Sequence, residues 1–270
     1  MASSMKRLKA ADMRLLTALW QELADAPAAE CDAALRHCLE QLCGLIGACN
    51  AIWVGARRQP APETDDPLRG WRIHGVEHLH HQERRLAMAR ELASHLDAGQ
   101  TDPYLAAVIR HAGRTRSHLR TELMNDKDWR SSWIVREALE DERIDDRLEG
   151  GHAISVGCES HFALDRRQDE RPFNDYERDL LCFFLLGSRT FQRELLLSRG
   201  LASAFSPFSL RECDVLKLLL TDASEREIAI HLGIGYRTAH QHAASIYAKL
   251  GVRGRQGLMA LWLRGGKTGL

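Results

Sequence analysis

Two capping boxes and a glycine-bounded turn near the C-terminus constrain the fold of this chain more than any other feature. In each box a serine stands three residues before a glutamate, so the serine caps the first turn of a helix and the glutamate bonds back to it. The two pairs are Ser209 with Glu212 and Ser224 with Glu227. A Gly-Ile-Gly turn at residues 233–235 and a third helical pattern over residues 236–250 follow. Two short helices, a tight turn and a longer helix make a helix-turn-helix.

The third predicted helix has an apolar face and a polar face. The small and apolar side chains recur at helical spacing and are Ala239, Ala243, Ile246 and Leu250. The opposite face carries Arg237, His240, Gln241, Ala244 and Ser245. Because the apolar face packs inward, the polar face is free to enter a groove of duplex DNA.

The segment from residue 208 to residue 264 closely resembles the LuxR/FixJ-type DNA-binding domain. The matching positions stand at the family's spacing and are Arg211-Glu212, Val215-Leu216, Ser224, Glu227-Ile228-Ala229, Leu232, Thr238, His242, Ile246, Lys249-Leu250, Val252 and Arg255. Two positions depart from the family pattern. Ala239 replaces the usual valine, which loosens packing, and His240 stands where the family often has lysine, which removes a fixed positive charge from the reading face.

The resemblance implies which side chains meet base edges. These are His240, Gln241 and Ala244, with Arg237 beside them. A glutamine pairs with adenine through two hydrogen bonds, and an alanine methyl contacts the methyl group of thymine. Arg237 suits either a guanine or a phosphate.

Other residues of the module are predicted to hold the DNA backbone. Arg226, Thr238 and Lys249 are interpreted as phosphate contacts that position the helix without reading sequence. Ser245 completes the predicted DNA-binding face. By the same resemblance, His242 lies against the core of the module and has a structural role.

The last helical pattern, residues 256–263, predicts a dimer contact. Leu258, Leu261 and Trp262 give it an apolar face with few competing polar groups. Such a face suits a two-fold interface, which places two recognition helices about one turn of DNA apart.

The first 205 residues predict an α+β domain with an antiparallel sheet of about five strands and flanking helices. Helical patterns cover residues 13–23, 35–46, 82–98, 103–113 and 128–139. Alternating patterns predict strands at residues 50–56, 70–76, 152–157 and 159–166. Residues 114–123 fit neither pattern.

One long helix is predicted to connect the two parts. Asn174 caps a periodic apolar segment that reaches residue 199, and a Ser- and Pro-containing stretch follows it. We therefore predict a regulatory domain at residues 1–199 that includes this exit helix, a linker at 200–207 and a four-helix DNA-binding domain at 208–270.

The N-terminal part resembles a GAF-like sensor domain of the PAS/GAF class. The resemblance lies in the stretches 124–129, 144–146 and 161–166 and in the Pro172-Phe173-Asn174 segment before the exit helix. It implies a concave sheet that holds a small molecule. The candidate lining residues are Trp53, Trp71, Ile154, Val156 and Phe162, and the alternative for each is plain core packing.

Two other sensor classes share some features with this segment. Asp102-Pro103 and Trp129 are similar to residues of the autoinducer-binding LuxR domain, but residues 82–100 lack the aromatic residues expected there. A phosphoacceptor receiver is disfavoured because no acidic pair follows an early strand. The autoinducer-binding domain stays an alternative to the GAF-like one.

Charge is balanced overall and uneven along the chain. The protein has 37 basic and 37 acidic residues, and from Ser206 onward basic residues outnumber acidic ones by nine to five. A basic module on an acidic body is expected where only the module meets a polyanion. The apolar runs are too short to span a bilayer.

The remaining chemistry excludes several function classes. Seven cysteines without Cys-x-x-Cys pairs predict neither a disulfide framework nor a zinc ribbon, and they favour a reducing cytoplasm. His74, His78 and His81 with Glu77 are interpreted as a solvated, pH-sensitive face and not as a metal site. No fingerprint of an enzyme or a cofactor site is present, so we expect neither catalysis nor a cofactor.

The sequence thus supports a cytoplasmic, homodimeric transcriptional regulator that senses a small molecule and binds promoter DNA. The alternative from another class is a signalling adaptor whose helix-turn-helix is vestigial and serves only protein contacts. Two features keep that alternative open. The C-terminal module has only a small excess of basic residues, and His240 brings no fixed positive charge to the reading face.

Overall fold

The structure is a computed structural model that describes residues 8–59, 66–80, 95, 100–202 and 208–263. The chain forms two compact units. The first comprises Met1–Gln21 with Arg36–Arg189, and the second comprises Glu22–Leu35 with Thr190–Leu270. The functional boundaries at residues 199 and 208 stay a prediction.

The first unit is built on a five-stranded antiparallel sheet in the order β2-β1-β5-β4-β3. Its strands are β1 (Asn50–Arg58), β2 (Trp71–His78), β3 (Arg116–Leu119), β4 (Ile144–Ser155) and β5 (Cys158–Arg167). The predicted α+β class with an antiparallel sheet is confirmed. β3 lies in the segment that fitted neither pattern, because its pairing partner β4 is distant in sequence.

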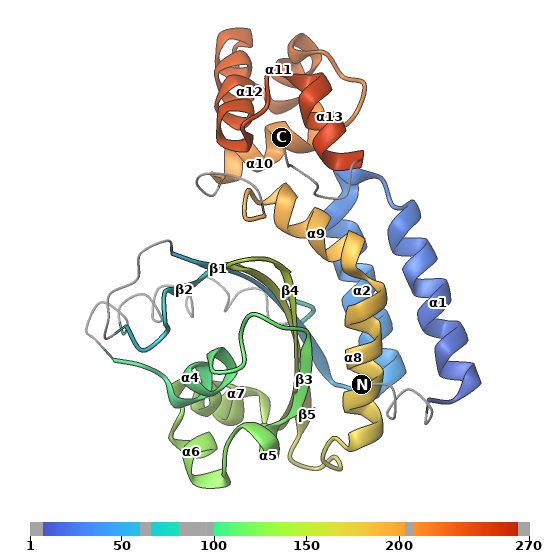
Figure 1. Ribbon diagram of the computed structural model, residues 1–270, viewed down its shortest axis with the longest axis vertical. Helices are drawn as coiled ribbons and strands as arrows, with labels where there is room; N and C mark the ends of the chain where they lie inside the picture. Colours follow the sequence, from blue (N-terminus) through green and yellow to red (C-terminus); the bar gives the residue numbers. More distant parts are fainter. Residues whose placement is uncertain (1–7, 60–65, 81–94, 96–99, 203–207, 264–270) are drawn as a thin grey trace. The chain divides into compact units, whose positions relative to one another are not determined.

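Helices cover both faces of this sheet (Figure 1). Those on one face are α4 (Pro103–Ile109), α5 (Arg120–Leu123), α6 (Asp126–Ser131) and α7 (Trp133–Glu142). The other face packs against α8 (Asp175–Gly187), beside which lie α1 (Ala10–Asp25) and α2 (Cys31–Ile46). A short 3-10 helix, η2, spans Ala28–Glu30. The predicted helix at residues 82–98 lies outside the described residues apart from His95.

The sheet face that packs on α8 holds the main aromatic core of the first unit. Trp53 and Phe162 are register partners on β1 and β5, and neither side chain is exposed. The rings of Phe162 and Phe184 meet edge to face with centroids 5.3 Å apart. Trp53 also donates from Nε1 to the Ser160 hydroxyl at 2.8 Å. Large aromatic side chains thus form the core between β1, β5 and α8.

The predicted continuous exit helix is wrong at one position, Ser188. The chain forms α8 up to Gly187, and α9 (Arg189–Ser198) starts after Ser188. A Cβ atom at Gly187 would overlap the indole of Trp20, and the Ser188 hydroxyl donates to the carbonyl of Phe184 at 2.8 Å. A Gly-Ser pair is a known site of helix kinks, because a side-chain hydroxyl competes for the helical carbonyls.

The described residues of the second unit form helices and the turns between them. Besides α9 it contains α10 (Leu210–Leu219), α11 (Glu225–Leu232), α12 (Tyr236–Leu250) and α13 (Arg255–Leu263). Its core includes Val215, Leu216, Ile228, Ala243 and Ile246, which are all at most 1% exposed. The core therefore joins α10, α11 and α12 into one packed body.

Candidate functional site

The predicted capping boxes start α10 and α11. The hydroxyl of Ser209 accepts from the backbone N–H of Glu212 at 3.2 Å, and that of Ser224 accepts from Glu227 at 3.3 Å. Each glutamate accepts in return from the serine N–H. Gly233 ends α11 with a φ of +64°, a left-handed conformation that glycine adopts at little cost. The turn then places α12 across α11.

The two faces of α12 have the burial that its sequence pattern predicts. The side chains packed into the core are Ala239, Ala243, Ile246 and Leu250. The exposed ones include Arg237, Thr238, His240, Gln241 and Ala244. The structure therefore brings five of the predicted DNA-binding residues together on one accessible surface, which we call the reading face.

Ser245 and Lys249 differ from these five because both bind Glu212. The Ser245 hydroxyl and the Lys249 ammonium each donate to the carboxylate of Glu212 at 2.7 Å. Glu212 is only 5% exposed. Burial acts to raise its pKa, but the hydrogen bonds from Lys249, Ser245 and Ser209 outweigh burial and lower the pKa to about 2. Glu212 thereby ties α12 to the first turn of α10.

His240 is held by a partner on the preceding helix. Its Nδ1 lies 2.9 Å from a carboxylate oxygen of Glu225, and its ring stacks on Tyr236 with centroids 6.3 Å apart. The guanidinium of Arg226 lies over the same tyrosine ring, 5.9 Å from its centroid. Arg226 is itself exposed, as a phosphate contact requires. His242 is half-buried, next to the core residue Ala243.

Arg255 has a structural role that its place in the sequence pattern alone did not reveal. Its guanidinium donates to the carbonyls of Leu219 at 3.0 Å and Ala223 at 2.6 Å, and also to that of Thr221. These carbonyls belong to the end of α10 and the loop after it. One arginine therefore satisfies the last carbonyl of α10, which a helix C-terminus leaves free, and two carbonyls of the loop after it.

Residues 206–262 match the family model for bacterial regulatory proteins of the luxR family. The C-terminal module is a LuxR-family helix-turn-helix domain. The family is one of DNA-binding transcription regulators and not a class of enzymes. No curated protein matched the chain.

Two solved structures are similar to the chain as a whole. One is SdiA in complex with octanoyl-rac-glycerol, at 14% identity and a TM-score of 0.49, with 96% of this chain and 96% of that chain covered. The other is Escherichia coli SdiA in space group P6522, at 14% identity and a TM-score of 0.46, with 94% and 97% covered. Such distant similarity assigns no ligand to the first unit of this chain.

The predicted dimer residues of the LuxR-family domain lie in its own core. Leu258, Leu261 and Trp262 are each at most 6% exposed and pack with the core of the second unit. Arg193 of α9 also donates to the backbone carbonyl of Leu261 at 2.6 Å. The apolar face of α13 is thus covered within the chain, and a dimer contact through these three side chains stays a prediction.

The predicted ligand-lining residues of the first unit do not form one site. Trp53 and Phe162 belong to the core beneath α8, whereas Val156 is fully exposed in the turn between β4 and β5. Trp71 and Ile154 are buried on β2 and β4, both 8% exposed. None of the five lines the cavity that the structure shows on the opposite face of the sheet.

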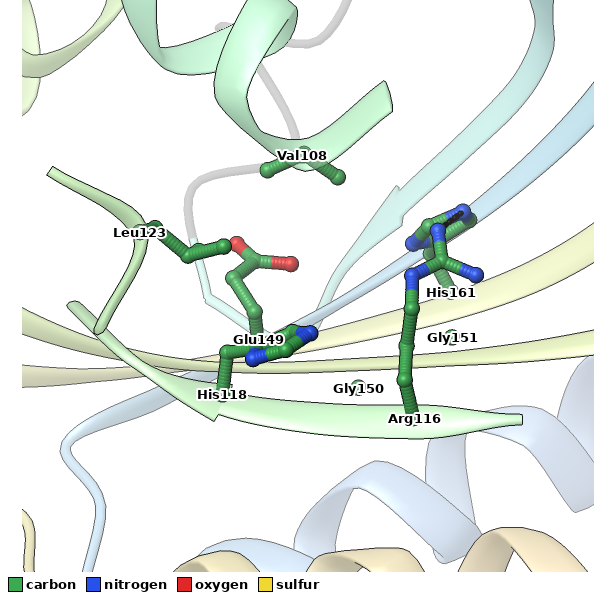
Figure 2. Close-up of a pocket in the computed structure, with 8 residues that line it drawn as sticks. All are labelled: Val108, Arg116, His118, Leu123, Glu149, Gly150, Gly151 and His161. Carbon is green, nitrogen blue, oxygen red and sulfur yellow. Dashed lines mark hydrogen bonds between the residues drawn. The ribbon is translucent and has the colours of Figure 1, made fainter. Parts of the chain in front are cut away.

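That cavity lies between the sheet and the helices α4 and α5, and Figure 2 shows its lining. Val108 and Leu123 face it from the helical side, and polar side chains rise from the strands. The polar lining residues are Arg116, His118, Glu149 and His161. Sequence reasoning missed them because Arg116 and His118 lie in the segment that fitted neither pattern and Glu149 precedes the predicted strand at residues 152–157. Only His161 stands on a predicted strand.

Asp102-Pro103, which resembles an autoinducer-domain motif, has a clear structural role here. The Asp102 carboxylate accepts from Tyr104 N at 2.8 Å and from Trp133 N at 3.0 Å, so it caps the first turns of both α4 and α7. Ser132 donates to the same carboxylate. Trp129 packs edge to face on Tyr104. These contacts give both residues a structural role, although the buried Nε1 atom of Trp129 has no partner among the described residues.

The cysteines and the histidine-rich segment offer no reactive centre among the described residues. All seven cysteines are free thiols, and burial raises the pKa of each. His74 and His78 lie on strand β2, whereas His81 is outside the described residues. No group of three metal-binding side chains occurs within the described part of the chain. None of the helices described there is long and apolar enough to cross a membrane.

Proposed function

We propose that this protein is a transcriptional regulator that binds promoter DNA as a dimer and responds to a small molecule held by its GAF/PAS-like N-terminal domain. One observation carries the proposal. The reading face of α12 is exposed and polar while the opposite face of the same helix is packed into a LuxR-family core. A helix with this division enters the major groove and presents three or four side chains to base edges.

The chemistry of the reading face supports sequence-specific contacts. Gln241 offers a donor and an acceptor for adenine, and Arg237 offers paired donors for guanine. Ala244 leaves a small apolar spot between polar neighbours, which suits a thymine methyl group. The contribution of Arg226 and Thr238 is then to hold the DNA backbone in register.

A signalling adaptor is the second candidate, and one observation favours it. Lys249 and Ser245 already bind Glu212, so two of the predicted DNA contacts have partners within the chain. If the other predicted DNA contacts also had partners within the chain, the module would serve protein contacts. The two proposals differ in whether the reading face binds duplex DNA.

The test is to select duplexes from random-sequence DNA with the full-length protein and to measure their affinity by gel shift. The double variant Arg237→Ala with Gln241→Ala should weaken binding to the selected duplex by more than about tenfold, because each lost base contact is worth roughly 1–3 kcal/mol. The matched control is Arg253→Ala with Gln256→Ala, which removes the same two side-chain types from exposed positions outside α12.

The control double variant should retain affinity within a few-fold of the original protein. Equal losses in both double variants would show that the effect is one of general charge, and unchanged binding in the first would refute the assignment of the reading face. Failure to select any duplex would favour the adaptor.

A further inference from the structure

A carboxylate at the start of α11 holds one residue of the reading face. The Nδ1 atom of His240 lies 2.9 Å from a carboxylate oxygen of Glu225. The histidine side chain is 62% exposed and that of Glu225 is 27% exposed, so the pair lies at the surface of the module. Glu225 is the first residue of α11, where the helix dipole favours a negative charge. A residue outside α12 thus fixes a side chain that is predicted to meet DNA.

The ring of His240 is also held from within α12. It stacks on the ring of Tyr236, one helical turn earlier, with an angle of 22° between the two planes. The guanidinium of Arg226 covers the same tyrosine. Within the described part of the chain, the one hydrogen bond of the imidazole is that of Nδ1 with Glu225. Nε2 is therefore the ring nitrogen that is left to bind a base.

The contact with Glu225 determines which ring nitrogen carries a proton. A carboxylate accepts hydrogen bonds and donates none, so Nδ1 of His240 is the donor and carries the hydrogen. In a neutral imidazole the second nitrogen has no hydrogen, so Nε2 is then an acceptor. When the ring takes up a second proton, Nε2 becomes a donor. The same atom thus has opposite hydrogen-bonding roles in the two charge states of the ring.

We propose that His240 reads one base of the DNA through its Nε2 atom and that Glu225 is the positioning residue that fixes the hydrogen-bonding role of this atom. The neutral ring then selects cytosine or adenine, whose amino groups face the major groove. The protonated ring selects guanine, whose O6 and N7 atoms are acceptors. The inference rests on the proposed function, since it assigns base specificity to the reading face. The preferred base at this position should therefore change with pH.

Other titratable and charged groups surround His240 on the two helices that hold it. These are Glu225 and Arg226 of α11 and Tyr236, Arg237 and Tyr247 of α12. Burial, followed by the charge of Glu225, raises the pKa of Tyr247, so this phenol stays neutral near pH 7. The charges of the other groups and of the DNA phosphates set the pH at which the ring changes state. They do not alter which role Nε2 has in each state.

The first experiment selects duplexes from random-sequence DNA with the full-length protein at about pH 8 and at about pH 5.5, because histidine changes its charge in this range. One position of the site should carry cytosine or adenine in the first set and guanine in the second. Two duplexes that differ only at this position are then compared by gel shift. Their order of affinity should reverse between the two pH values, with a preference of about two- to tenfold in each, the value of one hydrogen bond.

Two variants assign this reversal to the pair. His240→Gln forms hydrogen bonds without titrating, so its preferred base should be the same at both pH values, although the protein has 13 histidines. In Glu225→Gln the amide both donates and accepts, so either nitrogen of His240 can carry the proton. The preference of this variant at about pH 8 should fall to nearly equal affinity. The control Asp222→Asn removes an exposed acid from the loop before α11 and should keep the reversal.

A second measurement needs no DNA. Nitrogen NMR of the imidazole rings in the full-length protein distinguishes a proton on Nδ1 from a proton on Nε2, and the spectrum of His240→Gln identifies the signals of His240. At about pH 8 the neutral ring should carry its proton on Nδ1. In Glu225→Gln a large part should move to Nε2, the nitrogen that carries the proton in most free histidine. A role of Glu225 in helix stability alone would not move this proton.

The outcomes separate this inference from the proposed function. A proton on Nε2 of His240 in the original protein, one preferred base at both pH values, or equal changes in Glu225→Gln and Asp222→Asn would each overturn the inference while leaving DNA binding intact. Failure to select any duplex at either pH would overturn the proposed function, and the base contact of His240 with it, whatever the NMR spectrum shows.

Discussion

Glu212 shows how one side chain serves a helix start and a helix contact together. As the third residue of α10 it completes a capping box, and its other contacts come from Ser245 and Lys249 on α12. The first role is local and was predicted from the spacing to Ser209. The second depends on tertiary packing, which spacing alone does not define.

We predict that Glu212→Gln lowers the free energy of unfolding of the second unit by about 2–3 kcal/mol at pH 7, because the neutral amide replaces a buried carboxylate with a pKa of about 2 that pairs with the charged Lys249. The direction in which this loss of stability changes with pH follows from the depressed pKa of Glu212. The carboxylate stabilises the fold above its usual pKa of 4.5, and this contribution is lost as the pH falls toward about 2. The deficit of the variant should therefore shrink in acid.

Urea unfolding at pH 7 and pH 3, with hydrogen exchange of α10 and α12 amides to locate the loss, checks this prediction. Glu227→Gln is the matched control, since Glu227 completes the other capping box but is exposed. Equal deficits for the two variants would mean that only the cap matters and that the α12 contacts of Glu212 contribute nothing.

At the scale of elements, the end of α8 packs closely on α1. Gly187→Ala is predicted to destabilise the first unit by about 1–3 kcal/mol, because the added methyl group overlaps the indole of Trp20. Gly44→Ala on α2 is the control. A Cβ atom at Gly44 meets nothing within 4 Å, so this substitution should be neutral or stabilising by up to about 1 kcal/mol. Thermal unfolding of both variants measures these changes in stability. A Gly187→Ala variant as stable as the original protein would contradict the packing argument.

The elements also show what could be predicted from sequence and why the rest could not. The starts of α10 and α11 and the two faces of α12 depend on neighbours within one or two helical turns, so their patterns sufficed. β3 forms only because distant β4 pairs with it, and Gly187, which stands beside the break at Ser188, packs on Trp20 from far earlier in the chain.

The same limit applies to the candidate site of the first unit. Aromatic residues on strands suggested a ligand, but Trp53 and Phe162 fill the core beneath α8. Glu149 stands between Leu148 and Gly150 on β4, in a segment that the sequence patterns did not assign to a strand. Its burial depends on α4 and α5, which no local pattern places over it.

At the scale of the whole molecule, the uneven charge becomes a prediction about salt. If Arg226 contacts a phosphate, its replacement by alanine should reduce the slope of log K against log salt by about one for each copy that binds, because each contact releases condensed counterions. A dimer on its site would therefore lose about two. Gln241→Ala should weaken binding without changing the slope, since an uncharged base contact releases none.

These two variants separate the electrostatic contribution of the module from its sequence reading within one set of titrations. The full-length protein, Arg226→Ala and Gln241→Ala are titrated on the selected duplex at several salt concentrations, and sedimentation under the same conditions gives the number of copies bound. A slope change near one with two copies bound would mean that only one subunit's Arg226 reaches a phosphate. A flat salt dependence in the full-length protein would mean that the excess of nine basic over five acidic residues from Ser206 onward does not meet a polyanion, which is the expectation for an adaptor.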